Sequence, residues 1–241
     1  MQPLPPSEAP HGSALVAAPS STVPVPQTPW NDSYQLHGNI AQTIELSLDE
    51  GQSMWASKGA LICYDDSIEW SLEIPGNSLS RMLSGEGLTM TRVTAKRPGA
   101  KVVLGANDTG KIAAWDLSWG PVTCTPGAFL AAVGGVQIDV TAARRAGAAF
   151  FGGAGLLLQK ISGRGLVFIH GKGDFIQRDL AAGERLLVST GNLAAYGSEV
   201  DYGVVGVGGL FKMLFAREGV FMTQLTGPGR VLLQTLKRVH V

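Results

Sequence analysis

A glycine-bounded loop between Gly105 and Lys111 is the first feature with the spacing of a chemical motif. It matches most of the phosphate-binding loop, in which a second glycine is followed by lysine and then by a hydroxyl residue. Ile112 occupies the hydroxyl position, so the side chain that would hold Mg²⁺ is missing. The loop also leads into an apolar, strand-like segment, whereas phosphate binding of this type needs a helix N-terminus. The sequence therefore predicts a glycine hairpin turn here and no nucleotide site.

Histidine and cysteine are too sparse for a metal centre or a nucleophilic triad. His170 and Asp174 flank Gly171–Gly173, a second hairpin-like turn, but few other residues could complete a metal site. Cys63 and Cys124 are the two cysteines, and we expect both to be small buried residues without a disulfide. No sequence signature of covalent catalysis is present. We therefore expect no catalytic residue, no metal and no cofactor, and predict that the protein is not an enzyme.

Three short segments combine basic and large apolar side chains, and they carry the strongest functional signal. Each is predicted as a short helix at the end of a repeat, over residues 78–83, 141–150 and 210–215. Surfaces of this kind are typical of contacts with membranes or with partner proteins. The residues expected to form the surface are Arg81, Arg144, Arg145, Phe150, Phe151, Phe211, Lys212 and Phe215. The competing interpretation is that the apolar side chains cap the core while the basic groups are solvated.

One pattern of glycines and strands occurs three times along the chain, and it organises these segments. Each copy has a glycine, a short strand, a second glycine seven or eight positions later, and then an apolar strand. The second glycines are Gly59, Gly127 and Gly191, which follow one another at nearly equal intervals. Another pattern, starting at positions 85, 153 and 217, recurs at the same two intervals. Two patterns that share one period predict a threefold internal repeat.

The repeat predicts an all-β fold, a triplicated β-sandwich or double-stranded β-helix with pseudo-threefold symmetry. We expect a single domain over 34–241, with repeats at about 36–105, 106–170 and 171–241. Because the chain starts and ends within a repeat, the strands of 36–48 are predicted to pair with those of 229–239 and to complete the last unit. That pairing would close a ring and leave no free strand edge.

Composition narrows the class of partner. The chain has 241 residues with 19 basic and 19 acidic side chains, and a net charge of zero argues against nucleic acid as the main partner. Residues 1–33 are rich in proline and are predicted to form a disordered tail. The segment from Met1 to Gln27 contains no Lys or Arg and no unbroken apolar stretch of signal-peptide length. We therefore expect a cytoplasmic protein that is at most peripheral to a membrane.

Several glycine and strand motifs resemble the mitochondrial biogenesis family named for altered inheritance of mitochondria. They include Gly153–Gln159, Gly163–Gly165, Leu225–Gly229 and Val231–Gln234, and the similarity covers about residues 36–240. The resemblance implies a triplicated β-sandwich or double-stranded β-helix, similar to the Trp RNA-binding attenuation protein. It implies no catalytic residue. Since a presequence is missing, the chain resembles a bacterial-type member of the family.

Together these observations predict a non-catalytic β scaffold that binds a protein partner or a membrane surface. Exposed apolar segments would also allow homo-oligomers. The alternative is a module that binds a small ligand or single-stranded nucleic acid, in which sheet edges and glycine turns supply backbone groups.

Overall fold

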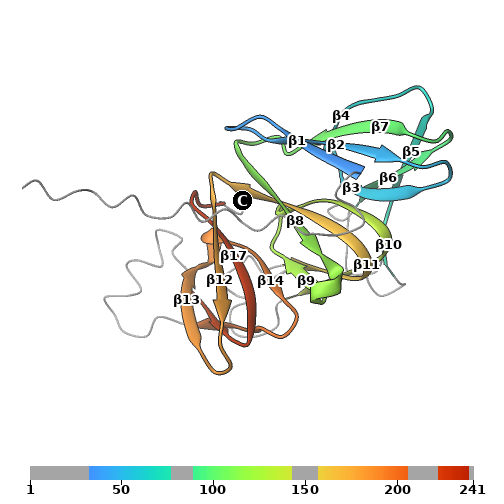
Figure 1. Ribbon diagram of the computed structural model, residues 1–241. Helices are drawn as coiled ribbons and strands as arrows, with labels where there is room; N and C mark the ends of the chain where they lie inside the picture. Colours follow the sequence, from blue (N-terminus) through green and yellow to red (C-terminus); the bar gives the residue numbers. More distant parts are fainter. Residues whose placement is uncertain (1–32, 77–88, 143–156, 206–221, 239–241) are drawn as a thin grey trace, which may run out of the picture.

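A computed structural model describes residues 33–76, 89–142, 157–205 and 222–238 (Figure 1). Regular structure in these residues is mainly β-strand, with single turns of 3-10 helix at Leu117–Trp119 and Thr190–Asn192. The predicted all-β class is therefore confirmed. No helix in these four ranges is long and apolar enough to cross a membrane.

The first part of the chain, which we call unit 1 (residues 43–105), pairs its strands in two sets of three. β2, β7 and β4 lie side by side in that order, and so do β3, β6 and β5. β1 extends the first set by pairing with β2. The strands are β1 Tyr34–His37, β2 Thr43–Leu48, β3 Ser53–Ser57, β4 Leu61–Tyr64, β5 Ile68–Glu73, β6 Met90–Ala95 and β7 Ala100–Gly105.

The same pairing scheme occurs in two further stretches, unit 2 (residues 110–172) and unit 3 (residues 175–234). In unit 3, β12, β17 and β14 form one set, and β13, β16 and β15 form the other. In unit 2, one half of β11 lies between β8 and β10, and the other half lies between β9 and β10. The strands are β8 Gly110–Asp116, β9 Val122–Cys124, β10 Phe129–Ala142, β11 Leu157–Lys172, β12 Phe175–Leu180, β13 Arg185–Ser189, β14 Leu193–Gly197, β15 Asp201–Val205, β16 Met222–Thr226 and β17 Gly229–Gln234.

β10 and β11 are long because each passes through both sets of unit 2. They pair with each other from Phe129 opposite Ile169 to Ala142 opposite Leu157. Where they pass from one set to the other, Gly134 lies opposite Gly165. Both of these glycines have positive φ angles, a backbone conformation that residues with a side chain rarely adopt.

Edge strands of adjacent units pair with each other, so that one ten-stranded sheet runs through all three units. β3 of unit 1 pairs with β10 of unit 2, and β9 of unit 2 pairs with β14 of unit 3. Figure 1 shows the units in a row, with unit 1 at the upper right and unit 3 at the lower left. Each unit therefore continues the hydrogen-bonded sheet of the unit before it.

Two predictions about strand pairing are wrong. Residues 36–48 do not pair with 229–239 in the described residues, because β12 and β14 occupy the two edges of β17. The glycine turns at 105–110 and 171–173 do not close hairpins, since each carries the chain from one unit into the next. Glycine allows the chain to turn, but it does not select the strand that the next segment will join.

The predicted short helices are not seen in the described residues. Residues 78–83 and 210–215 lie outside the described ranges. The helix expected over 141–150 is wrong at its start, because β10 continues through Ala142 and pairs there with β11. The remainder of that segment also lies outside the described ranges.

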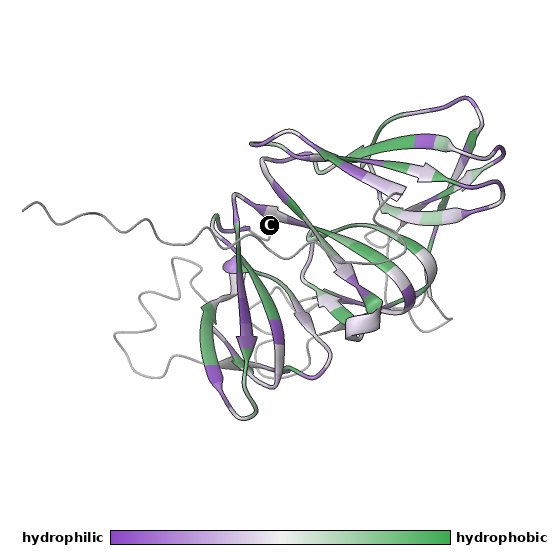
Figure 2. Cartoon of the chain, in the orientation of Figure 1, coloured by the Kyte–Doolittle hydropathy of each residue, from purple (hydrophilic) through white to green (hydrophobic). Residues whose placement is uncertain are grey.

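The apolar core extends across the unit junctions. Figure 2 shows apolar residues concentrated along β10 and β11, which lie at the centre of the row. The buried cluster around β2 and β7 includes Leu166 and Phe168 of unit 2, and the ring of Tyr34 packs edge-on against Phe168 at 5.1 Å. The cluster around β9 and β11 in turn includes Ala194 and Leu232 of unit 3. The units are therefore joined by shared apolar packing as well as by backbone hydrogen bonds.

A threonine hydroxyl strengthens the junction between units 2 and 3. The buried Thr125 donates from Oγ1 to the Leu193 carbonyl at 2.8 Å, with the Ala194 carbonyl at 3.1 Å. We expect Thr125→Val to lower the free energy of unfolding by about 1–2 kcal/mol, since the buried Leu193 carbonyl loses this hydroxyl donor while the side-chain volume is kept. Urea unfolding measures the change, and Thr109→Val, at an exposed side chain, is the control. Equal effects of the two substitutions would contradict the assignment.

Candidate functional site

The eight residues predicted to form a basic and aromatic surface all lie outside the described ranges. They fall in three connections that occupy the same place in each unit, between β5 and β6, between β10 and β11, and between β15 and β16. Their role as a surface therefore stays a prediction. The described residues offer two other features that could support function, a groove at one face and a buried polar cluster.

The groove lies at the junction of units 2 and 3 and has a volume of about 210 Å³. Trp115 and Trp119 of unit 2 form one side, and Asp179 and Arg230 of unit 3 form the other. The rim is backbone-rich; its remaining residues are Gly120, Pro121, Gly197, Ser198, Glu199 and Gly229. Because two units contribute to it, the groove exists only where β9 pairs with β14.

Trp119 is the most exposed ring in this groove, with 44% of its surface accessible. A 3-10 turn presents it, and Asp116 caps this turn by accepting a hydrogen bond from the Ser118 backbone N–H at 2.7 Å. The ring of Trp115 meets Trp119 edge-on, with centroids 6.1 Å apart. Trp115 is itself fixed, since its Nε1 donates to the Gly120 carbonyl at 3.1 Å. The exposed indole is therefore held in one orientation before any partner binds.

Arg230 covers the other side of Trp119. Its guanidinium carbon lies 4.7 Å from the centre of the Trp119 ring, a cation–π contact. Arg230 Nε also donates to Asp179 Oδ1 at 2.9 Å, and Gln177 donates to the other carboxylate oxygen. Burial alone would raise the pKa of Asp179, but the hydrogen bonds from Arg230 and Gln177 outweigh it and lower the pKa. The carboxylate therefore stays ionised and orients Arg230 over the indole.

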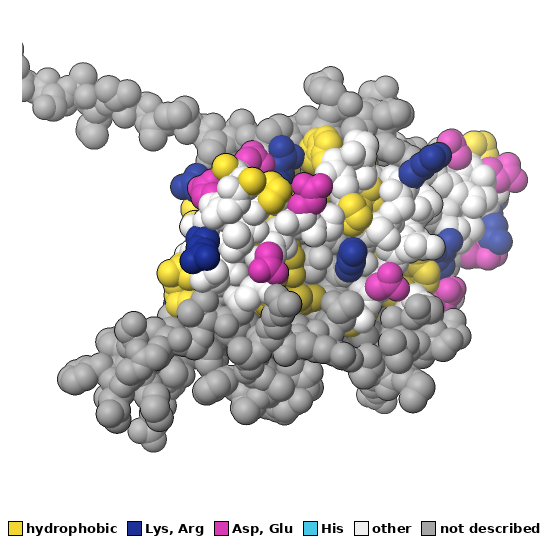
Figure 3. Space-filling model, turned by 90° about the horizontal axis from the view of Figure 1, so that it is seen from below, with side chains coloured by type: hydrophobic (Ala, Val, Ile, Leu, Met, Phe, Trp, Pro, Cys, Tyr) yellow, Lys and Arg dark blue, Asp and Glu magenta, His cyan; other side chains and the backbone are white. Residues whose placement is uncertain are grey.

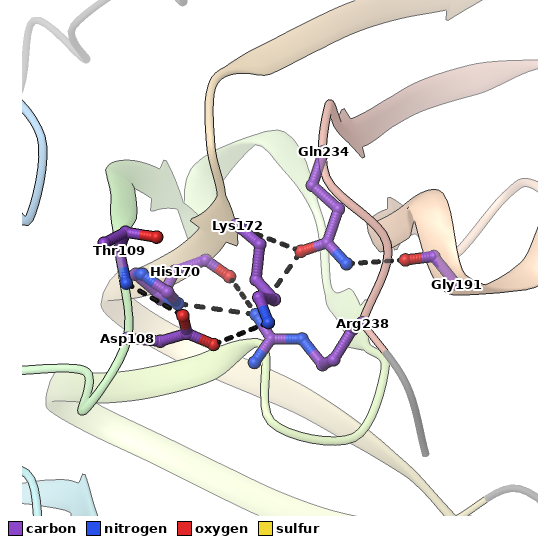
Figure 4. Close-up of polar contacts among 7 residues, drawn as sticks. All are labelled: Asp108, Thr109, His170, Lys172, Gly191, Gln234 and Arg238. Carbon is purple, nitrogen blue, oxygen red and sulfur yellow. Dashed lines mark hydrogen bonds and ion pairs between the residues drawn. The ribbon is translucent and has the colours of Figure 1, made fainter.

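The second feature is a buried cluster around His170, drawn in Figure 4. Arg238 approaches His170 from the C-terminal segment, with its Nη2 3.4 Å from Nδ1 of the ring and 3.1 Å from the His170 carbonyl. The same nitrogen lies 3.3 Å from Gln234 Oε1, which also accepts from the Lys172 backbone N–H. Lys172 Nζ reaches Asp108 at 2.9 Å. The cluster joins the chain end to the link between units 2 and 3.

Burial and positive neighbours keep His170 neutral. Its side chain is 1% exposed, and burial together with the charge of Arg238 lowers its pKa to about 4. Because Arg238 donates toward Nδ1, the ring proton lies on Nε2, for which the described residues provide no hydrogen-bond partner. In the described residues, no three His, Cys, Asp or Glu side chains come together as metal ligands would. The contacts of the cluster are those of a structural tie between chain segments.

The prediction for the two cysteines is correct for one and wrong for the other. Cys124 is fully buried in β9, and burial raises the pKa of its thiol to about 12. Cys63 is exposed, because it lies on β4, the last strand of its set. Its apolar sequence neighbours suggested a covered strand, yet nothing in the described residues pairs with the outer edge of β4.

Charges of both signs are mixed on one face of the described residues (Figure 3). Figure 3 shows basic and acidic side chains interspersed over one face, with no broad region of a single sign. This agrees with the equal numbers of basic and acidic residues in the chain. The groove and the buried cluster were not found from the sequence, because their members come from segments that are distant in the chain.

The fold and the groove describe an all-β protein built from serially paired units, and comparison with known proteins gives its family. The chain belongs to the AIM24 mitochondrial biogenesis family, whose model matches residues 34–236. This confirms the resemblance seen in the sequence.

Two streptococcal proteins are similar to the chain. An uncharacterized protein of Streptococcus pyogenes serotype M6 is 26% identical over 204 residues, which cover 80% of this chain and 81% of that protein. The crystal structure of a second Streptococcus pyogenes protein superposes with a TM-score of 0.71 at 21% identity, covering 85% of this chain and 93% of the other. At that identity the similarity shows the fold alone.

Proposed function

We propose that the protein is a non-catalytic β scaffold that binds a protein partner at the groove around Trp119. The half-exposed indole, fixed between Trp115 and Arg230, is the observation that carries the proposal. Tryptophan and arginine contribute most to binding energy at protein interfaces, and fixing them in advance reduces the entropy lost on association. The predicted surface of basic and aromatic residues would add a second contact area on the same scaffold.

The shape of the groove favours a protein partner over a small ligand. Its volume of about 210 Å³ is below the roughly 300–1,000 Å³ of pockets that enclose small molecules. A groove with an exposed ring at one side and an ion pair at the other suits a side chain or a turn presented by another protein. The mixed charge of the surface gives little attraction for a nucleic-acid backbone. A cytoplasmic location, at most peripheral to a membrane, is part of the proposal.

Site-specific photocrosslinking in the source organism tests the proposal. A photoreactive amino acid at Ser198, on the groove rim, is expected to give a discrete adduct with another protein, identified by mass spectrometry. The adduct should be lost when Trp119→Ala is added and kept with Trp70→Ala, at an exposed tryptophan outside the groove. We expect at least a tenfold loss of crosslinking, which corresponds to one binding hot spot of about 1.4 kcal/mol or more.

Two results would contradict the proposal. An adduct that persists in Trp119→Ala would show that the indole does not contribute to binding. Equal crosslinking from Ser198 and from Ile40, an exposed residue between β1 and β2 and outside the groove, would indicate nonspecific contact. Sedimentation with vesicles of phosphatidylcholine and phosphatidylglycerol tests the membrane alternative. Sedimentation that depends on Trp119 would indicate that the groove binds a lipid surface and not a protein.

A further inference from the structure

The units join by the same strand pairing at both junctions, and in the described residues this pairing leaves one strand edge free in the first unit and one in the last. At both junctions, the second strand of one unit (β3 or β9) pairs with the third strand of the next (β10 or β14). The third strand of unit 1 is β4 and the second strand of unit 3 is β13. In the described residues, β4 pairs only with β7 and β13 only with β16. The first and last units therefore each keep one half of a junction.

The two junctions have one register, which predicts how these free edges fit. Positions can be counted from the glycine between the second and third strands of each unit, Gly59, Gly127 or Gly191. The residue three before this glycine lies opposite the residue four after the glycine of the next unit, Ala56 opposite Ala131 and Cys124 opposite Ala195. Applied to the free edges, the same register places Val188 opposite Cys63.

We propose that β13 of one copy of this protein pairs antiparallel with β4 of a second copy, in the register of the internal junctions. Tyr64 then lies opposite Leu187, and Asp66 lies opposite Arg185, so that opposite charges meet at the end of the new pair. The contact is head-to-tail, and every copy keeps one free edge of each kind. Assembly therefore continues into a ring or a filament. This inference is independent of the proposed function.

Exposure of apolar residues at the free edges supports the pairing. Ile62 on β4 is 57% exposed, whereas its equivalents Leu130 and Ala194 are buried at the internal junctions. Leu187 on β13 is 58% exposed, whereas its equivalents at the internal junctions are buried (Thr123) or partly buried (Trp55). Apolar side chains are thus exposed at positions that are buried or partly buried where a neighbouring unit is present. Burying them against a second copy would remove this surface from water.

A hydroxyl group recurs at the same place in all three units. Ser57 donates to the Phe129 carbonyl across the first junction, and Thr125 donates to the Leu193 carbonyl across the second. Both residues are two before the counting glycine, and both acceptors are two after the next one. Ser189 holds the donor position in unit 3, so its hydroxyl is placed to donate to the Leu61 carbonyl of the second copy. The free edge of unit 3 has the side chain that completes a junction.

Closure within one chain is not the explanation for these edges. Figure 1 shows β13 and β4 at opposite ends of the row of units, with unit 2 between them. Other strands with a free edge, such as β1, β5 and β15, are not the second or third strand of a unit, so the pairing seen at the junctions does not apply to them. A second copy supplies the complementary edge in the required direction.

Charged substitutions test the head-to-tail contact on the full chain. We expect the mass from light scattering to rise with concentration for the wild type and to stay that of a monomer for Leu187→Lys and for Ile62→Lys. Because each variant keeps one intact edge, mixing the two should give a one-to-one dimer and nothing larger. Ile40→Lys, at an exposed residue away from both edges, should assemble as the wild type does. Dimers of either edge variant alone, or a monomeric wild type, would overturn the proposal.

Disulfide trapping tests the register of the proposed pairing between β13 and β4. Val188→Cys copies the cysteine that unit 2 has at the equivalent position, Cys124, which favours normal folding. Mild oxidation should link it to Cys63 of the next copy and give a ladder of reducible oligomers, because residues directly opposite across strands have suitable spacing. The same change in a Cys63→Ser background should give no ladder. A ladder that persists without Cys63, or no ladder from a folded Val188→Cys protein, would overturn the register.

Discussion

Replacing Gly163 with alanine should unfold or nearly unfold the protein. Gly163 lies in β11 where the strand passes from one set of unit 2 to the other, with φ at +106°. A Cβ atom there would collide with the carbonyl oxygen of Gly135 and lie 3.2 Å from the Cα atom of Val136. These are backbone atoms of the paired strand and cannot move aside as a side chain would. We expect the free energy of unfolding to fall by at least about 3 kcal/mol.

A matched glycine separates the clash from the cost of the backbone angle. Gly51 also has a positive φ, +76°, but a Cβ atom there would meet nothing within 4 Å. Gly51→Ala should therefore cost only about 1–2 kcal/mol, the penalty for a left-handed conformation. Urea denaturation followed by circular dichroism measures both variants. Similar losses for the two would show that the close approach of β10 and β11 is not what requires glycine.

Lowering the pH from 7 to 5 should destabilise the protein through His170. In the unfolded chain this imidazole takes up a proton near pH 6.5, whereas in the folded protein its pKa is about 4. Between these values the unfolded state binds more protons, so stability falls as the pH drops through this window and is unaffected above it. Arg238, Lys172 and Asp108 are the charged groups around the ring. The loss from pH 7 to 5 is on the order of 2 kcal/mol.

Substitution of His170 with glutamine isolates this contribution. Gln234 occupies the equivalent position in unit 3, so the side chain suits the fold. Each of the two residues directly follows the one, Ile169 or Leu233, that lies opposite the residue two after Gly127 or Gly191. Whatever constant shift His170→Gln causes at all pH values, the fall between pH 7 and 5 should become smaller by about 2 kcal/mol. His37→Gln, at a half-exposed histidine, should keep the fall seen in the wild type. An unchanged pH dependence in His170→Gln would contradict the assignment.

The β-strand character of the chain was predictable from the sequence because it depends on local patterns. Alternating apolar residues and the glycines at 59, 127 and 191 mark where each strand begins and ends. The all-β class and the family follow from these marks. Pairing partners were not predictable in the same way. Any apolar strand can pair with another, and the turns at 105–110 and 171–173 connect separate units where the pattern suggested hairpins.

The candidate groove was not predictable from the sequence for a related reason. Trp119 and Arg230 belong to different units and are distant in the sequence, and their contact depends on the pairing of β9 with β14. Asp116, Ser118 and Trp119 form a local turn that sequence analysis could have noted, since an acidic residue two before serine commonly caps a turn. The exposed Cys63 shows a different error, because its apolar strand was taken as covered, whereas in the described residues no strand pairs with the outer edge of β4.

The shared strand edges give the three units unequal resistance to local opening. Unit 2 is held by two junctions, at β10 and at β9, whereas units 1 and 3 are each held by one. In a linear array with nearest-neighbour coupling, the ends open first and the centre opens last. Amide protons of β10 and β11 therefore exchange most slowly, and those of β4 and β13 exchange early. Joining copies end to end into a closed ring would abolish this difference, since every unit would become an internal one.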